Sequence, residues 1–226
     1  MTFNQVNLII DQWFGWKNEA ILLFNTTTFN MKKTIIAIAA LFATAGAMAQ
    51  SSTWKSDNSH SNVKFTVTHL VVSEVEGAFK VYNGTIVSAK PDFTDAKIDF
   101  SVDVNSINTD NENRDKHLKS DDFFNAEKFP QMKFVSTSFK KVSGNKYVLE
   151  GNLTIRDVTK PVKFDVTYGG TVKDPWGNIK AGFKAKGTIN RFDYNLKWNT
   201  LTEAGGAVVG KEVEVVVNLE LAQQKA

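Results

Sequence analysis

The chain of 226 residues carries 27 basic and 24 acidic side chains, a near balance that excludes the strongly basic pattern of nucleic-acid-binding proteins. It has no cysteine, which excludes disulfides, catalytic thiols and a lipid anchor on cysteine. The length suffices for one domain with a complete hydrophobic core, which needs no disulfide.

Residues 31–49 have the three parts of a secretory signal peptide. Residues 32–33 are lysines, residues 34–46 are apolar or small, and residues 47–49 form an A-x-A cleavage site. The apolar run is shorter than the roughly 20 residues that span a bilayer. We therefore expect cleavage after Ala49, a periplasmic or secreted protein, and no membrane span in the mature chain.

Residues 1–30 precede this signal and have neither a basic start nor a clear period. Because a signal peptide acts from the N-terminus, we expect translation to begin at Met31 and residues 1–30 to be upstream sequence. The alternative is a genuine N-terminal extension with a weakly amphipathic helix around residues 9–24. The remaining residues, 50–226, are predicted to form a single domain.

This domain alternates between apolar and polar residues along most of its length, which is the period of a β-strand with one buried face. The clearest runs are residues 62–68, 97–104, 147–155, 162–168, 179–190 and 212–221. One buried and one wet face per strand indicates an antiparallel sheet. About eight strands joined by short turns predict a barrel or a sandwich, a mainly β fold.

The apolar face of these strands mixes aromatic residues with small ones such as Gly151, Ala185 and Gly187. A barrel of about eight strands can be filled by side chains or can hold a small ligand, and the strands alone leave both interpretations open. The same parity places His69 and Arg191 inside, each at a strand end and so at a mouth. A slip by one residue would place both in solvent. The main inward apolar positions are Val63, Phe65, Val67, Phe79, Phe100, Val102, Phe164, Phe183 and Ile189.

Residues 113–124 interrupt the alternation and are dense in charge. They are predicted to form a short helix, capped by Asp110, with Arg114, His117 and Asp121 along one side. One interpretation is an acid/base or anion site on that side. The other, which we favour because no nucleophile or further ligand is spaced to complete a site, is a structural helix that plugs the sheet. The plugging residues would be Leu118, Phe123, Phe124 and Phe129.

No catalytic or metal-binding motif is present, so we predict neither an enzyme nor a cofactor; the three histidines lack the spacing of a zinc site. Arginine, the better side chain for phosphate, occurs only at Arg114, Arg156 and Arg191. Arg191 has the best case for an anion contact because its parity points inward. The alternative is that Arg156 caps a turn and Arg114 pairs with a nearby carboxylate.

Four blocks, taken in order and together, resemble the YceI-like proteins of bacteria over Trp54 to Leu221. They are Asp57-Asn58-Ser59-His60-Ser61 with Phe65-Thr66-Val67-Thr68-His69; Arg114-Asp115-Lys116-His117-Leu118 with Asp122-Phe123-Phe124 and Phe129-Pro130; Gly151-Asn152-Leu153-Thr154-Ile155 with Val158-Thr159-Lys160-Pro161-Val162; and Asn190-Arg191-Phe192-Asp193-Tyr194. The family commonly has glycine where this chain has Asp157 and Asn195. Both residue types tolerate a positive φ, so we expect the same turns.

This resemblance implies a periplasmic or secreted, lipocalin-like antiparallel barrel with a helical insertion. It also implies an apolar lumen that binds amphiphiles such as polyisoprenoids, including isoprenoid quinones and isoprenyl pyrophosphates, without an established catalytic activity. The inward apolar positions given above would then contact the lipid tail, and His69 and Arg191, with Arg114 or His117, would contact its head group. Two alternatives are a hydrolase or isomerase that uses His69 or His117 as a base on such a lipid, and an envelope interaction module with a filled core. A homodimer is possible under each.

Overall fold

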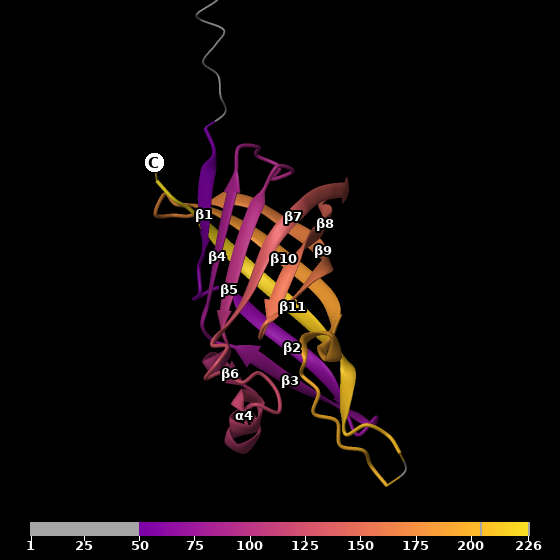
Figure 1. Ribbon diagram of the computed structural model, residues 1–226. Coiled ribbons are helices and arrows are strands. Elements are labelled where there is room, and N and C mark those ends of the chain that lie inside the picture. Colours follow the sequence, from indigo (N-terminus) through magenta and orange to yellow (C-terminus); the bar gives the residue numbers. More distant parts are fainter. Residues whose placement is uncertain (1–49, 204, 226) are drawn as a thin grey trace, which may run out of the picture. The chain divides into compact units, whose positions relative to one another are not determined.

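The computed structural model describes residues 50–203 and 205–225, and these form one compact β-structure (Figure 1). The predicted signal peptide and the segment before it lie outside the described residues. The strands are β1 (Ser52–Ser56), β2 (Asn62–His69), β3 (Ser73–Phe79), β4 (Tyr82–Ser88), β5 (Lys97–Asp103), β6 (Ile107–Asn108), β7 (Gln131–Ser143), β8 (Lys146–Ile155), β9 (Val158–Lys173), β10 (Ile179–Asn190) and β11 (Val209–Gln223). The helices are η1 (Val104–Ser106), α4 (Glu112–Lys119) and η2 (Arg191–Tyr194).

Eight strands close into an antiparallel barrel in the order β1-β4-β5-β7-β8-β9-β10-β11, with β11 pairing back to β1. Strand β2 also pairs with β11, beyond the end of β1, and β3 and β6 extend the sheet from there. Strands β1 and β2 thus follow one another along the same edge of β11. The prediction of a mainly β, lipocalin-like antiparallel barrel with a short helical insertion is confirmed.

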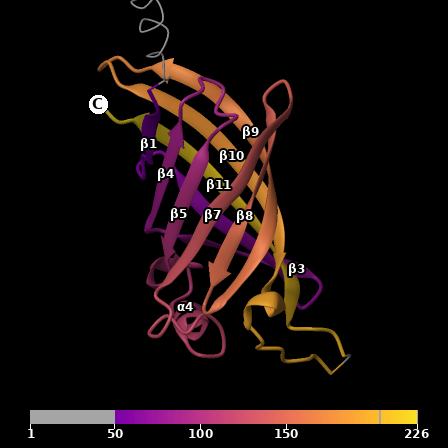
Figure 2. The ribbon, with the colours of Figure 1, turned by 45° about the horizontal axis from the view of Figure 1, so that its top comes forward.

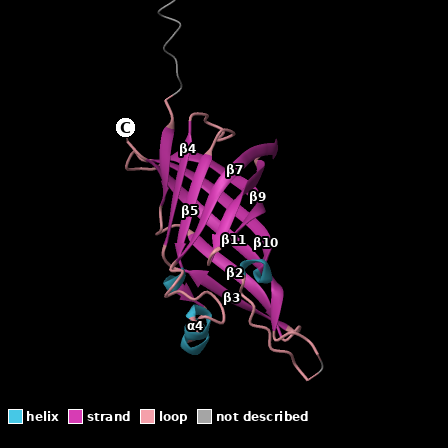
Figure 3. Ribbon diagram, in the orientation of Figure 1, coloured by secondary structure: helices cyan, strands magenta, loops and turns pink. Residues whose placement is uncertain are grey.

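The two ends of the barrel differ. The helix end carries α4, η2 and the β2–β3 turn, and Figure 3 shows the helices gathered there. The opposite end, here called the aromatic end, carries the β7–β8 and β9–β10 turns (Figure 2).

The aromatic end is closed from within by Phe93, which is only 2% exposed. Its ring lies 5.2 Å from that of Trp54, 5.1 Å from Phe183 and 5.7 Å from Tyr168. The β4–β5 loop that carries Phe93 is organised by Asp95, whose carboxylate accepts hydrogen bonds from the Ser88 hydroxyl at 2.6 Å and from backbone amides of the loop. This end of the barrel is therefore filled with side chains.

The charged segment does form a helix, but its boundary differs from the prediction. Asn111, and not Asp110, is the N-cap of α4, and its side chain accepts a hydrogen bond from the Arg114 amide at 3.0 Å. Asp110 instead has a positive φ of 57° just before the cap. The helix ends at Lys119, so Asp121 does not continue its stripe.

Candidate ligand-binding cavity

A cavity of about 210 Å³ lies inside the barrel, toward the helix end. All the predicted tail residues except Phe183 line it. Its wall is almost wholly aliphatic and aromatic, and the only charged residues that border it are Lys64, Lys133 and Arg191. The interior is therefore hollow at the helix end and filled at the aromatic end, so neither of the two interpretations left open by the strands holds for the whole barrel.

Phe183 was predicted to face the ligand, but the structure places it in the aromatic end. Its ring lies 5.0 Å from that of Tyr168 and 6.3 Å from that of Phe139. Strand parity gave its inward direction correctly. Strand parity does not predict which part of the barrel interior is filled by the loop that carries Phe93.

The helical segment supplies part of the cavity wall through Leu118, Phe123 and Phe124, as the plug interpretation of the segment predicted. Phe129 does not line the cavity; its ring packs 5.5 Å from the guanidinium of Arg156. Met132 and Phe134 of β7 also line the wall, as does Leu196 after η2. Sequence reasoning missed all three, although Met132 and Phe134 alternate with Lys133 as strand residues do.

Aromatic side chains lie flat on the wall because glycines on neighbouring strands make room for them. Phe100 faces Gly84 across β5 and β4, and a Cβ on that glycine would lie 2.8 Å from the ring. Phe65 faces Gly77 in the same way, at 2.3 Å. Small residues thus help to create the lumen, because they allow large rings to lie against the sheet and not to point into the lumen.

Arg191 is the one predicted head-group residue that borders the cavity, and it is only 4% exposed. Its guanidinium donates four hydrogen bonds to backbone carbonyls: Nε to Gly210 at 2.8 Å, Nη1 to Leu196 at 2.6 Å and Trp198 at 2.7 Å, and Nη2 to Val209 at 3.0 Å. Burial lowers its pKa below the ordinary value of an arginine, but an arginine remains a cation in a protein. Among the described ion pairs none involves Arg191, so its positive charge lies beside an apolar cavity without a carboxylate partner. Four of its five N–H groups donate to these carbonyls, and the fifth is left for another acceptor.

The other head-group candidates do not border the cavity. His69 pairs with Val209 at the end of β2. His117 places Nε2 2.8 Å from an Asp122 carboxylate oxygen, and its ring meets Trp198 edge-on at 5.4 Å. The structure therefore does not bring His69, His117 and Arg191 together into one polar site.

Arg114 has a structural partner of its own. Its Nε donates to the Thr109 hydroxyl at 2.7 Å and its Nη2 to the Thr109 carbonyl at 2.6 Å. Asp115 accepts from the amide and hydroxyl of the same threonine. This network fastens the start of α4 to the chain after β6 and leaves Arg114 away from the cavity wall.

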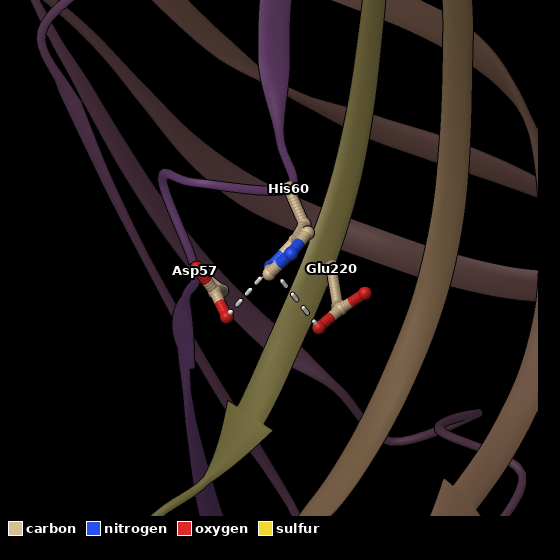
Figure 4. A group of neighbouring side chains, drawn as sticks. All are labelled: Asp57, His60 and Glu220. Atoms are coloured by element: carbon tan, nitrogen blue, oxygen red, sulfur yellow. Dashed lines mark hydrogen bonds and ion pairs between the residues drawn. The ribbon is translucent and has the colours of Figure 1, made fainter. Parts of the chain in front are cut away.

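One group of side chains has the composition of a metal site: Asp57, His60 and Glu220, drawn in Figure 4. The ammonium of Lys180 lies 2.6 Å from the Asp57 carboxylate and 3.1 Å from that of Glu220. The hydrogen bond from Lys180 is the main cause that lowers the pKa of Asp57 to about 2. The ammonium of Lys180 thus already pairs with both carboxylates, and the group is an ion-pair cluster.

The YceI-like domain family matches residues 54–221, and a UPF0312 protein of Pectobacterium atrosepticum is 37% identical over 198 residues, which cover 86% of this chain and all of that one. The chain belongs to the YceI-like family. Protein YceI of Salmonella newport has the same identity and coverage.

Solved structures share the barrel. The Campylobacter jejuni YceI protein matches with a TM-score of 0.60 and 34% identity, covering 70% of this chain and 90% of that one. BcnA of Burkholderia cenocepacia matches with a TM-score of 0.62 at 24% identity, covering 73% and 98%. A polyisoprenoid binding domain from Saccharophagus degradans, at 17% identity and a TM-score of 0.56 over 76% and 98% of the two chains, shares the fold.

Within residues 50–203 and 205–225, no helix is both long and apolar enough to cross a membrane.

Proposed function

We propose that this YceI-like protein binds a long-chain lipid, of the polyisoprenoid class or similar in shape, in its barrel cavity. The observation that carries the proposal is the apolar cavity itself, closed by Phe93 and its neighbours at the aromatic end and bordered by one buried cation at the helix end. The described cavity wall presents no histidine, carboxylate or hydroxyl group, which favours binding over catalysis.

The tail supplies most of the affinity in this proposal. Each Å² of apolar surface removed from water contributes about 25 cal/mol, and an almost wholly aliphatic and aromatic wall does not select one apolar tail over another. Flat rings such as Phe65 and Phe100 suit a slender, branched chain, because such a chain contacts the ring faces along its length.

The head group is assigned to the helix end, beside Arg191. A buried guanidinium with carbonyl partners only keeps its full positive charge, and an anionic head group would neutralise it. We expect the pyrophosphate ester of an isoprenoid to bind more tightly than the alcohol with the same tail. The signal-like residues 31–49 support a periplasmic or secreted location for this activity.

Native mass spectrometry of the protein, secreted from bacteria and purified without detergent, tests the proposal. We expect a co-purifying lipid on the wild type and its loss in Ala185→Phe, because Ala185 lines the cavity and a phenyl ring there fills it. The matched control is Lys184→Phe, the same ring on the exposed neighbour in β10, which should keep the lipid. A wild type that stays empty after incubation with isoprenyl pyrophosphate would overturn the proposal.

A further inference from the structure

The β2–β3 turn exposes three consecutive apolar side chains at the helix end. Leu70 is 41% exposed, Val71 70% and Val72 84%. The loop after η2 lies beside this turn, joined by a hydrogen bond of 2.9 Å from the Leu70 amide to the Val208 carbonyl, and adds Leu201, which is 58% exposed. The β2–β3 turn and the loop after η2 extend from the same end of the barrel (Figures 1 and 2). These four side chains are here called the apolar tip.

The backbone of the turn is strained at these same residues. The φ angles of Leu70 and Val71 are 51° and 65°, and the Val72 amide donates back to the His69 carbonyl at 3.2 Å. Two central residues with positive φ are the pattern of a type I′ hairpin turn, for which Asn-Gly is the preferred pair. A β-branched valine in the left-handed region is a rare outlier. A strained turn that is retained although it exposes hydrophobic side chains indicates that their exposure has a function.

The apolar tip continues the cavity wall. Val67 lines the cavity, and so does Val209, which pairs with His69 one residue before the turn. Phe93 and its aromatic neighbours fill the opposite end of the barrel. A tail that left the cavity along β2 and β11 would reach the apolar tip next.

The shape and composition of the apolar tip indicate which kind of partner it can bind. It is a convex projection of a few aliphatic side chains, without the aromatic or arginine anchors of a stable protein interface. The flanking segments carry exposed charges of both signs, Lys197 and Lys211 with Glu74, Glu203 and Glu212. Such a surface has no strong attraction to an anionic partner, but it can insert into the apolar layer of a lipid bilayer.

We propose that the apolar tip docks the protein reversibly on a lipid bilayer, with the cavity mouth facing the lipid. The inference rests on the proposed function in one respect, since a lipid cargo gives docking a purpose. The contact is apolar, so its strength does not depend on anionic lipid or on salt. Four partly inserted aliphatic side chains give weak, reversible binding and not an anchor.

Flotation with phosphatidylcholine vesicles, with and without added phosphatidylglycerol, tests the proposal. The secreted protein is used after its mass confirms that residues 31–49 are absent, because that apolar segment would itself bind vesicles. We expect salt-insensitive binding that falls about tenfold in Val72→Ser, the effect of withdrawing one valine from the lipid. The matched control is Val142→Ser, a valine 64% exposed on β7, which should bind as the wild type does.

A second variant separates docking from folding. Leu70→Asn with Val71→Gly installs the preferred type I′ pair, so the melting temperature should rise by about 2–4 °C while vesicle binding falls. Three results would overturn the proposal: a wild type that does not bind vesicles, a Val142→Ser variant that loses as much vesicle binding as Val72→Ser, or a loss of vesicle binding only in Trp176→Ser at the aromatic end.

A wild-type dimer that dissociates in the tip variants would also overturn it, since a second copy of the chain would then cover the tip. Lipid co-purification is scored separately: an occupied cavity without vesicle binding refutes the docking alone, and vesicle binding by an empty protein refutes the lipid cargo alone.

Discussion

At the scale of single residues, Arg191 is the side chain on which the helix end most depends. Its guanidinium ties both ends of the loop between η2 and β11, Leu196 and Trp198 on one side and Val209 and Gly210 on the other. The guanidinium carbon Cζ also lies 4.2 Å from the centroid of the Phe192 ring. One arginine thereby satisfies four backbone carbonyls, and a lysine has neither the reach nor the number of donors to do the same.

Replacing Arg191 with methionine should lower the free energy of unfolding by about 3 kcal/mol or more, because four buried or partly buried carbonyls lose their donor. Urea denaturation measures the loss, and Arg191→Lys should recover only part of it. Lys211→Met, which removes an exposed cation from the start of the same β11, is the control and should change stability by less than about 0.5 kcal/mol. A similarly small loss of stability in Arg191→Met would contradict the conclusion that Arg191 holds the two ends of this loop together.

At the scale of elements, the lumen depends on rings and glycines that face each other on adjacent strands. Phe134 lies against Gly151, and Phe164 against Gly187, in addition to the pairs of Phe65 and Phe100. At Gly84 an added Cβ would meet only the Phe100 ring closer than 3.0 Å, whereas at Gly151 it would also meet the Val135 carbonyl oxygen at 2.5 Å. Gly84 is therefore the position where a change can move a ring without moving backbone.

Gly84→Ala should push the Phe100 ring into the cavity, reduce the bound lipid and cost about 1–3 kcal/mol of stability through overpacking. Adding Phe100→Leu should restore lipid binding, because the smaller side chain leaves room for the new methyl group. Native mass spectrometry and thermal unfolding give the two readouts. Gly182→Ala, where nothing lies closer than 3.9 Å, is the control, and failure of the double variant to regain lipid would contradict this arrangement.

Strand alternation predicted the elements better than the site. It correctly placed β2, β5, β8, β9, β10 and β11 and the inward direction of Arg191, because burial on one face leaves a period of two in the sequence. It could not predict the carbonyl partners of Arg191, which come from residues 196–210 and follow no period.

Turn conformation was predictable only in part. The expected positive φ occurs at Asn195, at 61°, but at the β8–β9 turn it falls on Arg156, at 55°, and not on Asp157. Arg156 is then free to donate to the carbonyls of Asp121, Phe123 and Asn195 and to the Asp121 carboxylate. A sequence indicates that a turn is present, but the long-range partners of a side chain decide which residue takes the strained conformation.

At the scale of the whole molecule, the barrel is closed along β11, where β1 and β2 succeed one another. The chain between them is held by the Asp57 amide, which donates to the Glu220 carbonyl at 2.8 Å, and by reciprocal hydrogen bonds between the Ser61 hydroxyl and the backbone of Glu220. Lys180 reaches this seam from β10 and pairs with Asp57 and Glu220. The cluster thus connects the first, second, tenth and eleventh strands at the point where the ladder changes partner.

Because Lys180 lowers the pKa of Asp57 from 3.8 to about 2, this ion pair should stabilise the fold above pH 3.8 and lose its effect as the pH falls through 2. The pKa of Lys180 is raised by the same contact, so its contribution is complete below 10.5 and is lost only at higher pH. Lys180→Met should therefore cost about 1–2 kcal/mol at neutral pH, and this difference from wild type should shrink in acid. Urea denaturation over a pH series measures this difference in the free energy of unfolding.

Lys186→Met, on the same strand and facing the exposed Glu214, is the control and should cost less than about 0.5 kcal/mol at every pH. A cost for Lys180→Met that does not change with pH would show that the seam depends on packing of the lysine side chain and not on its charge.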